Sequence, residues 1–308
     1  MSLEEKLNTI IIPDYPTSEV ALEEAVEVLR MKSREFDTTS AGSGIKGVNI
    51  VIVAGGSLKL PAASGLSMRG VPLAEALRHI TGLVGLKYTV ERHAVAIREQ
   101  NDQRVPVYQK TTSLQNHMEK RILPTVQFQD ASLEEALEYL RVNRGCYDMG
   151  DKIPPPLNYV LHLREGVKRP PISIDLKDIP LDEALRYCAE ISNVRLRYDP
   201  FAVVATDAET ESASLPATSS AQPILPLMDL NGATLEESLH FIRVKSRELN
   251  PDRSELSIVV KPGAPRASIT LCLSQIPLST ALCYIAEVSG NKLSYDVRSY
   301  VLSPVGLK

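Results

Sequence analysis

Six segments of the chain place apolar residues with the period of an amphipathic helix. Each carries the same short phrase, a leucine followed three residues later by a small residue and four residues later by an aliphatic one. The leucines that open the six phrases are Leu22, Leu73, Leu133, Leu181, Leu235 and Leu278. Because residues at i, i+3, i+4 and i+7 share one side of a helix, each segment predicts a helix whose apolar stripe lies on a sheet.

The phrases form three pairs, and strand patterns surround each pair. A proline stands nine positions before the first leucine, at Pro13, Pro124 and Pro226. Apolar and polar residues alternate over 126–129, which is the period of a half-buried strand. Another proline stands directly before the second leucine, at Pro72, Pro180 and Pro277. Since proline keeps its predecessor extended and is tolerated in a first helical turn, this arrangement predicts a strand that runs straight into a helix.

Two more apolar patterns complete each unit. One is a strand-like run between the helices, at 48–52, 157–161 and 256–260. The other is a closing hairpin with a Leu-x-Tyr phrase that ends at Tyr88, Tyr198 and Tyr295. Each unit therefore predicts the order β-α-β-β-α-β-β. The predicted fold class is α+β, with three tandem small βαββαββ domains whose helices pack on small mixed or antiparallel sheets.

The predicted domains cover residues 8–98, 121–205 and 223–304. Residues 99–120 form a polar linker that we expect to be partly helical. Residues 206–222 are rich in Ser, Thr and Pro, as is typical of a flexible linker, so the third unit is expected to be the most loosely tethered.

Composition narrows the function classes. The 308 residues carry a formal net charge of −4, which offers no electrostatic footprint for nucleic acid or anionic membrane. The longest apolar runs fall short of the roughly 20 residues of a membrane helix. No signal peptide is visible at Met1. Because Trp is absent and only four Phe are present, we expect aliphatic cores.

Candidate catalytic and metal-binding motifs have simpler explanations. The glycines between 42 and 56 satisfy neither phosphate-loop pattern, and the stretch 44–47, which mimics the GxxG clamp of RNA-binding KH modules, occurs in one unit only. Ser67 falls at an outward strand position rather than on a nucleophile elbow. The five histidines, none with metal-site spacing, are His79, His93, His117, His162 and His240. We therefore expect no catalytic, metal or cofactor site.

Acidic pairs and cysteines also favour structural explanations. Each first helix opens with acidic residues, and Ser132 with Glu135 and Thr234 with Glu237 form capping-box patterns, so these carboxylates are expected to cap helices. The four cysteines lack CxxC spacing, which favours free thiols over a disulfide framework. Cys188 is expected on an apolar helix face, and Cys146, Cys272 and Cys283 at loop or outward positions.

The unit resembles the short N-terminal domain shared by secretins and TonB-dependent receptors (the STN family). The second unit carries the resemblance best, through residues 126–128, 132–137, 158–161, 174–181 and 196–198. The resemblance implies a periplasmic or exported protein, with an export signal absent from this sequence, that acts as an interaction or signalling module ahead of an outer-membrane pore or receptor. The chain departs from secretins because it ends at Lys308 with no pore-forming domain, so we expect either a fragment or a member of a group of exported proteins built of such modules alone.

Repetition and resemblance together lead to a functional hypothesis. We expect a non-enzymatic protein-interaction or assembly module of a secretin-like cell-envelope protein, whose partner is an envelope protein such as a secretion component or the chain itself. Three copies on linkers would act multivalently, and exposed sheet edges could recruit a partner strand. The candidate interaction surface is Tyr88, Tyr198 and Tyr295. The alternative is an envelope module that binds a carbohydrate or peptidoglycan fragment, which predicts a polar cleft with exposed aromatic residues.

Overall fold

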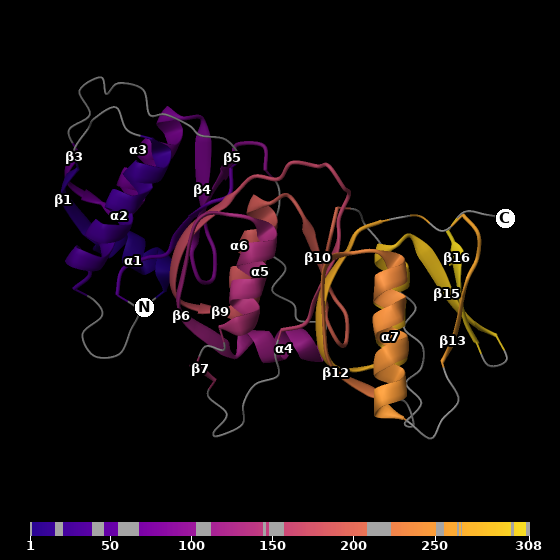
Figure 1. Ribbon diagram of the computed structural model, residues 1–308. Helices are drawn as coiled ribbons and strands as arrows, with labels where there is room; N and C mark the ends of the chain where they lie inside the picture. The colour runs from indigo at the N-terminus through magenta and orange to yellow at the C-terminus, as the bar shows by residue number, and fades with distance from the viewer. Residues whose placement is uncertain are drawn as a thin grey trace.

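Helices and strands alternate along the chain, and the mixed α+β class predicted above is confirmed (Figure 1). The computed structural model describes residues 2–15, 21–38, 46–54, 68–102, 112–143, 146–147, 157–207, 223–250, 256–263, 265, 267–296 and 299–305. Ser67, Gly42, Gly44, Gly55 and Gly56 and most of the 206–222 linker lie outside the described residues.

The elements of the first repeat follow the predicted order after one helix, α1, that was not predicted. They are α1 (Leu3–Thr9), β1 (Ile11–Tyr15), α2 (Leu22–Phe36), β2 (Ile50–Ile52), β3 (Met68–Pro72), α3 (Leu73–Leu83), β4 (Leu86–Val90) and β5 (Val95–Glu99).

The second repeat adds a short strand, β7, to that order. Its elements are α4 (Ser113–Glu119), β6 (Arg121–Ala131), α5 (Leu133–Val142), β7 (Cys146–Tyr147), β8 (Tyr159–His162), β9 (Ile172–Pro180), α6 (Leu181–Ile191), β10 (Arg195–Tyr198) and β11 (Val203–Thr206). Helix α4 confirms that the 99–120 linker is partly helical.

The third repeat returns to the predicted order. Its elements are β12 (Ile224–Ala233), α7 (Leu235–Leu249), β13 (Ser257–Val260), β14 (Ile269–Pro277), α8 (Leu278–Val288), β15 (Asn291–Asp296) and β16 (Ser299–Pro304).

Helix starts follow the local chemistry of the sequence. Ser132 with Glu135 and Thr234 with Glu237 form complete capping boxes on α5 and α7, as predicted. Helix α2 begins after Ala21 with no side-chain cap. The second helix of each repeat starts directly after its proline, with no side-chain cap needed at that junction.

Each repeat encloses its two helices between two small sheets. The sheet orders are β1-β3 and β2-β5-β4 in the first repeat, and β7-β6-β9 in the second. The third repeat contributes β13-β16-β15. In every repeat the first strand after the first helix that belongs to the hairpin sheet pairs in parallel with the last strand, as β2 does with β5, β8 with β11 and β13 with β16.

A five-stranded sheet crosses from the second repeat to the third. Its order is β10-β11-β8-β14-β12, and β8 pairs antiparallel with β14 through Tyr159–Cys272, Val160–Leu271 and Leu161–Thr270. The expectation that the third repeat is loosely tethered is therefore wrong, because main-chain pairing joins it to the second. The division into three domains with boundaries at 99–120 and 206–222 stays a prediction.

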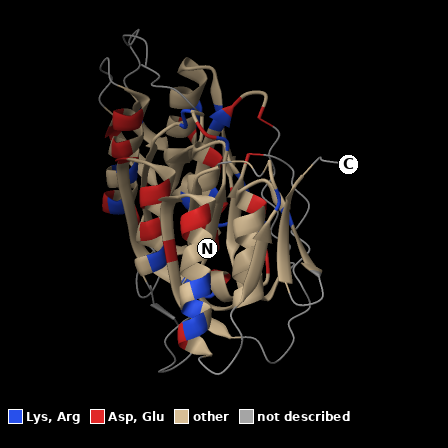
Figure 2. Cartoon of the chain, turned by 45° about the vertical axis from the view of Figure 1, so that its right-hand side comes forward, with Lys and Arg blue, Asp and Glu red and all other residues tan. Residues whose placement is uncertain are grey.

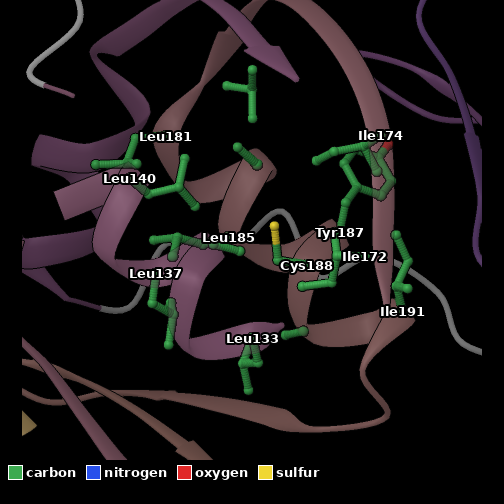
Figure 3. Packing of buried hydrophobic residues seen from close by; sticks show 14 of the residues in the cluster. Leu133, Leu137, Leu140, Ile172, Ile174, Leu181, Leu185, Tyr187, Cys188 and Ile191 are labelled. Carbon is green, nitrogen blue, oxygen red and sulfur yellow. The ribbon is translucent and has the colours of Figure 1, made fainter. Parts of the chain in front are cut away.

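The hydrophobic cores also cross the repeat boundaries. The core of the second repeat, built on the stripes of α5 and α6 (Figure 3), includes Val51 and Ala96 from the first repeat and Cys272 from the third. The core of the third repeat includes Val160 and Val204 from the second. One face of the β2-β5-β4 sheet therefore packs on the helices of the first repeat, and the other face packs on the second repeat. Strands β8 and β11 pack in the same way between the second repeat and the third.

This packing buries α6 and α8 on nearly all sides. Helix α6 buries Tyr187 and Ala189 in addition to its predicted stripe, and α8 buries Cys283 and Tyr284. Helix α3 has no preceding repeat and buries its stripe and Thr81 only. A helix that is apolar around its whole circumference is normally a buried one, and this signal separates α8 from α3 in the sequence.

Two of the cysteine positions predicted as outward are wrong. Cys272 and Cys283 are buried, as is Cys188 on the apolar face of α6, and all three are free thiols. The second face of β14 looks outward within the third repeat alone, but the second repeat covers it, and Cys272 belongs to the core of that repeat. Cys146 lies on β7, and its side chain is outside the described set.

Candidate functional site

An asparagine side chain makes the same main-chain contacts at both junctions between repeats. Asn49 donates from Nδ2 to the Lys177 carbonyl (2.9 Å) and accepts from the Lys177 N–H at Oδ1 (3.0 Å). Asn158 donates to the Ser274 carbonyl (3.0 Å) and accepts from the Ser274 N–H (2.8 Å). A side-chain amide presents one donor and one acceptor, as a peptide group does, so each asparagine extends a strand of one repeat towards the next.

A buried ionic cluster reinforces the first junction. Arg98 on β5 donates to Glu91 (2.7 Å) of its own repeat and to Glu190 (2.7 Å) on α6 of the next. Arg186 and the Tyr187 hydroxyl, both on α6, donate to the other Glu91 oxygen at 2.6 and 2.8 Å. The Arg98 and Glu91 side chains are almost fully buried.

The protonation states of this cluster follow from its contacts. Burial by itself would raise the pKa of Glu91, but Arg186, with Arg98 and the Tyr187 hydroxyl, holds it below its ordinary value. Burial raises the pKa of Tyr187 well above its ordinary value. Glu91 is therefore a carboxylate that accepts hydrogen bonds from three donors, and its role is to hold two repeats together.

The second junction uses a smaller set of the same kind. Arg197 on β10 donates to Asp199 (3.0 Å) in its own hairpin and to Glu287 (2.8 Å) on α8. Glu287 occupies the place on α8 that Glu190 occupies on α6, nine residues after the helix leucine. His162 lies 3.4 Å from Glu287, and together with Arg197 it lowers the pKa of Glu287 against the opposing effect of burial.

The third repeat carries an uncovered copy of the same junction surface. Strand β13 is the outer strand of the order β13-β16-β15, and no strand pairs with its other edge among the residues the structure describes. The corresponding edge of β8 pairs with β14. Ser257 stands where the first two repeats have Asn49 and Asn158. We call Ser257–Val260 the open edge; it lies at the C-terminal end of the molecule (Figure 1).

The open edge exposes apolar side chains that the other repeats bury. Val160 on β8 is 0% exposed, whereas its counterpart Val259 is 48% exposed and Val260 is 38% exposed. Neither β13 nor β16 carries a charged residue, and the strands beside the C-terminus are drawn mainly tan in Figure 2. Unprotected edges of this kind are pairing surfaces in β proteins, because charged residues or prolines normally block such pairing.

One main-chain group of the open edge has a side-chain partner. Arg243 on α7 donates to the Ile258 carbonyl at 3.0 Å. Arg141, at the same place on α5, pairs with Glu138 instead, and Tyr159, the counterpart of Ile258, pairs with Cys272 of β14. Arg243 therefore satisfies a carbonyl that faces a neighbouring strand in the second repeat.

The three candidate tyrosines lie in different environments. Tyr88 on β4 and Tyr198 on β10 are partly buried against their repeat cores. Tyr295 on β15 is 66% exposed and makes an edge contact with Tyr300, with ring centroids 5.2 Å apart. The structure thus places them on separate sheets rather than together, and Tyr295 alone of the three is largely accessible.

Two cavities adjoin the junctions. A pocket of about 260 Å³ beside the second junction is mainly apolar, with Leu114, Met118 and Phe201 in its wall. A wider cleft of about 860 Å³ beside the first junction has a mixed polar and apolar wall, and α2 and β6 supply Glu23, Glu24, Gln127 and Phe128 to it.

The described ranges contain no group of three or more His, Cys, Asp or Glu side chains arranged to hold a metal ion. None of the described helices combines the length and apolar character needed to cross a membrane. No family model, curated protein or solved structure matches the chain.

Sequence reasoning missed the junction residues, although a signal was present. Asn49 and Asn158 precede apolar runs at the same place in two repeats, and Ser257 replaces them in the third. Tyr187 and Tyr284 likewise share a position that the first repeat fills with His79. Differences between internal and terminal repeats are typical of arrays whose repeats stack on one another.

Proposed function

We propose that this chain is a non-enzymatic protein-interaction module of a cell-envelope assembly, and that the open edge is its binding surface. A partner strand would add to β13 antiparallel, in the way that β14 adds to β8. Main-chain hydrogen bonds would supply affinity, and the valines would supply apolar contact. The envelope assignment rests on the resemblance to secretin N-terminal domains.

The exposure of Val259 and Val260 is the observation that carries this proposal. Their counterparts in the second repeat, Val160 and Leu161, are buried and lie on β8, whose edge pairs with β14. The junction carboxylates Glu91 and Glu287, whose pKa values are lowered, support a structural interpretation, because both are engaged in ion pairs between repeats. Rigid junctions would hold the open edge in a fixed orientation and reduce the entropy lost on binding.

Affinity capture tests the proposal. The full chain is immobilised and exposed to a solubilised envelope fraction, beside a Val259→Lys variant and a matched Val142→Lys control. Val142 is an exposed valine at the end of α5, far along the chain from the open edge. We expect wild type and control to retain the same protein and Val259→Lys to lose it. Retention by all three variants would contradict binding at the open edge.

A carbohydrate-binding function is the second candidate, because the wall of the cleft beside the first junction combines polar side chains with an aromatic residue. Gln127, Gln129 and Phe128 of β6 line it together with Glu23 and Glu24 of α2. Such a set could hydrogen-bond sugar hydroxyls and stack against one sugar ring. Calorimetric titration with peptidoglycan fragments tests it: binding that Phe128→Ala abolishes would support this candidate, and the absence of heat with wild type would reject it.

A further inference from the structure

The main-chain geometry of β13 specifies which groups a partner strand would meet. The counterparts of Ser257 direct their carbonyls to the last strand of the repeat, as Asn158 does to Val203. Because alternate residues of a strand point their N–H and C=O groups to opposite sides, Ile258 and Val260 direct theirs to the open side. The contact of Arg243 with the Ile258 carbonyl agrees with this assignment.

The first repeat of another copy is a poor match for this edge. By analogy with β14 and α8, a head-to-tail contact would use β3 and the outer face of α3. That surface presents Arg69, Arg78 and His79, all largely exposed. In the internal junctions α6 and α8 instead present a buried tyrosine and a glutamate to the preceding repeat. The polar N-terminal face therefore resembles the capping end of a repeat array.

The open edge is, by contrast, complementary to itself. Two copies related by a two-fold axis bring their β13 strands together antiparallel, which is the orientation of β14 on β8. Ser257–Val260 contains no charged residue, so no like charges oppose each other. When the two-fold axis passes beside Val259, the main-chain N–H and C=O of Ile258 in one copy pair with those of Val260 in the other. The two Val259 side chains then lie opposite each other.

We propose that this chain forms a two-fold dimer through its β13 edges, so that the β15-β16-β13 sheets of two copies become one continuous sheet. The proposal rests on the proposed function and names its partner as a second copy of the chain. Val259 opposite Val259 reproduces the register of Val160 opposite Leu271 inside the chain. The Arg243 guanidinium leaves the Ile258 carbonyl as the strands pair.

The interface is small. Stable complexes bury roughly 800 Å² per partner, and a strand of this length with its flanking side chains supplies less. We therefore expect a reversible dimer with a dissociation constant on the order of 10 µM rather than an obligate one.

Sedimentation velocity of the purified full chain over a wide concentration range measures this equilibrium. We expect the wild-type mass to rise from the 33.8 kDa monomer towards twice that value as concentration increases. Val259→Lys places two ammonium groups opposite each other and should weaken association at least tenfold, whereas Val142→Lys should leave it unchanged. Unaltered urea midpoints in both variants would show that folding is intact. A wild type that stays monomeric, or a Val259→Lys variant that dimerises normally, would overturn the proposal.

Cysteine cross-linking tests the register. In a Cys146→Ser background the remaining cysteines, Cys188, Cys272 and Cys283, are buried. A Val259→Cys variant should then form an intermolecular disulfide on mild oxidation, because residues at a non-hydrogen-bonded pair have Cβ atoms within bridging distance. A Ser257→Cys variant should not, since its residue lies opposite position 261 in this register. Equal cross-linking of the two variants would reject the two-fold geometry.

Failure of the dimer and failure of the proposed function are distinguishable. The sedimentation and cross-linking experiments contain only purified protein, whereas the capture experiment supplies envelope proteins. A monomeric chain that captures an envelope protein through Val259 overturns the dimer and leaves the proposed function in place. If Val259→Lys weakens the dimer and the wild type retains no envelope protein, the dimer is supported and binding of another envelope protein is rejected.

Discussion

The side-chain amide of Asn158 bonds both the N–H and the C=O of Ser274, at 2.8 and 3.0 Å, and so links the second repeat to the third. The same amide nitrogen also donates to the Phe201 carbonyl at 2.9 Å. Asn49 makes the matching pair of bonds to Lys177 at the first junction. One residue type at one repeat position thus provides the polar half of both junctions, next to the buried apolar contacts.

Replacing Asn158 with Asp should destabilise the chain by about 2 kcal/mol. The carboxylate keeps the acceptor but loses the donor, which leaves two buried carbonyls unsatisfied and places a negative charge beside them. Urea unfolding followed by circular dichroism measures the change. Ser257→Ala is the matched control at the terminal repeat, where we expect a change within about 0.5 kcal/mol. Equal losses at both positions would contradict a special role for the junction.

The Glu91 cluster predicts a loss of stability in acid. The folded pKa of Glu91 lies below its unfolded value, so its contribution is fully present above the unfolded pKa of about 4.3 and is lost as the pH falls through the folded pKa. The pKa of Glu287 at the second junction is also lowered, so its contribution to stability is likewise lost in acid. We expect the urea midpoint to be nearly constant from pH 7 to 5 and to fall steeply below pH 4.

A Glu91→Gln variant shows how much of the acid dependence of stability comes from Glu91. It leaves Arg98 and Arg186 without this carboxylate, and breaking a buried ion pair of this kind costs about 3 kcal/mol. The variant should be less stable than wild type at pH 7 and should lose part of the acid dependence below pH 4. An acid dependence identical to that of wild type would show that other carboxylates govern it.

Helix α2 has no side-chain N-cap, and a single substitution at Ala21 could provide one. Ala21 has the extended backbone of an N-cap (φ −63°, ψ 152°), close to that of Ser132 (φ −72°, ψ 164°), and Glu24 stands three residues later. Ala21→Ser should complete a capping box and stabilise the chain by about 1 kcal/mol. The reverse change, Ser132→Ala, should cost about the same. Thermal melting of both variants checks these opposite shifts.

The buried cysteines should react slowly with thiol reagents in the folded protein. Burial raises the pKa of Cys188 to about 12, of Cys272 to about 11 and of Cys283 to about 12, so little thiolate forms at pH 8. In a Cys146→Ser variant, a chromogenic disulfide reagent should detect almost no thiol until urea is added. Rapid reaction of one thiol under native conditions would indicate that the second repeat separates readily from the third.

The local structure of this chain could be predicted from its sequence because local rules decide it. The stripe of Leu133, Leu137 and Leu140 has helical period, Ser132 and Glu135 cap the start of that helix, and Pro180 joins β9 to α6. Hydrogen bonds and sterics within a few residues enforce each of these features. The repetition of the pattern extended the prediction to the element order of all three repeats.

Only the tertiary structure decided how the repeats meet, because that depends on surfaces whose partners are distant in the sequence. Val160 and Val259 occupy the same position in corresponding apolar runs, yet the strand of the first pairs with β14 and its side chain is buried, while the second is exposed. The strand pattern of the third repeat predicts that Cys272 points outward, but the second repeat buries it. Burial at a junction is a property of two repeats together, so the periodicity of one repeat cannot reveal which of its faces remains open.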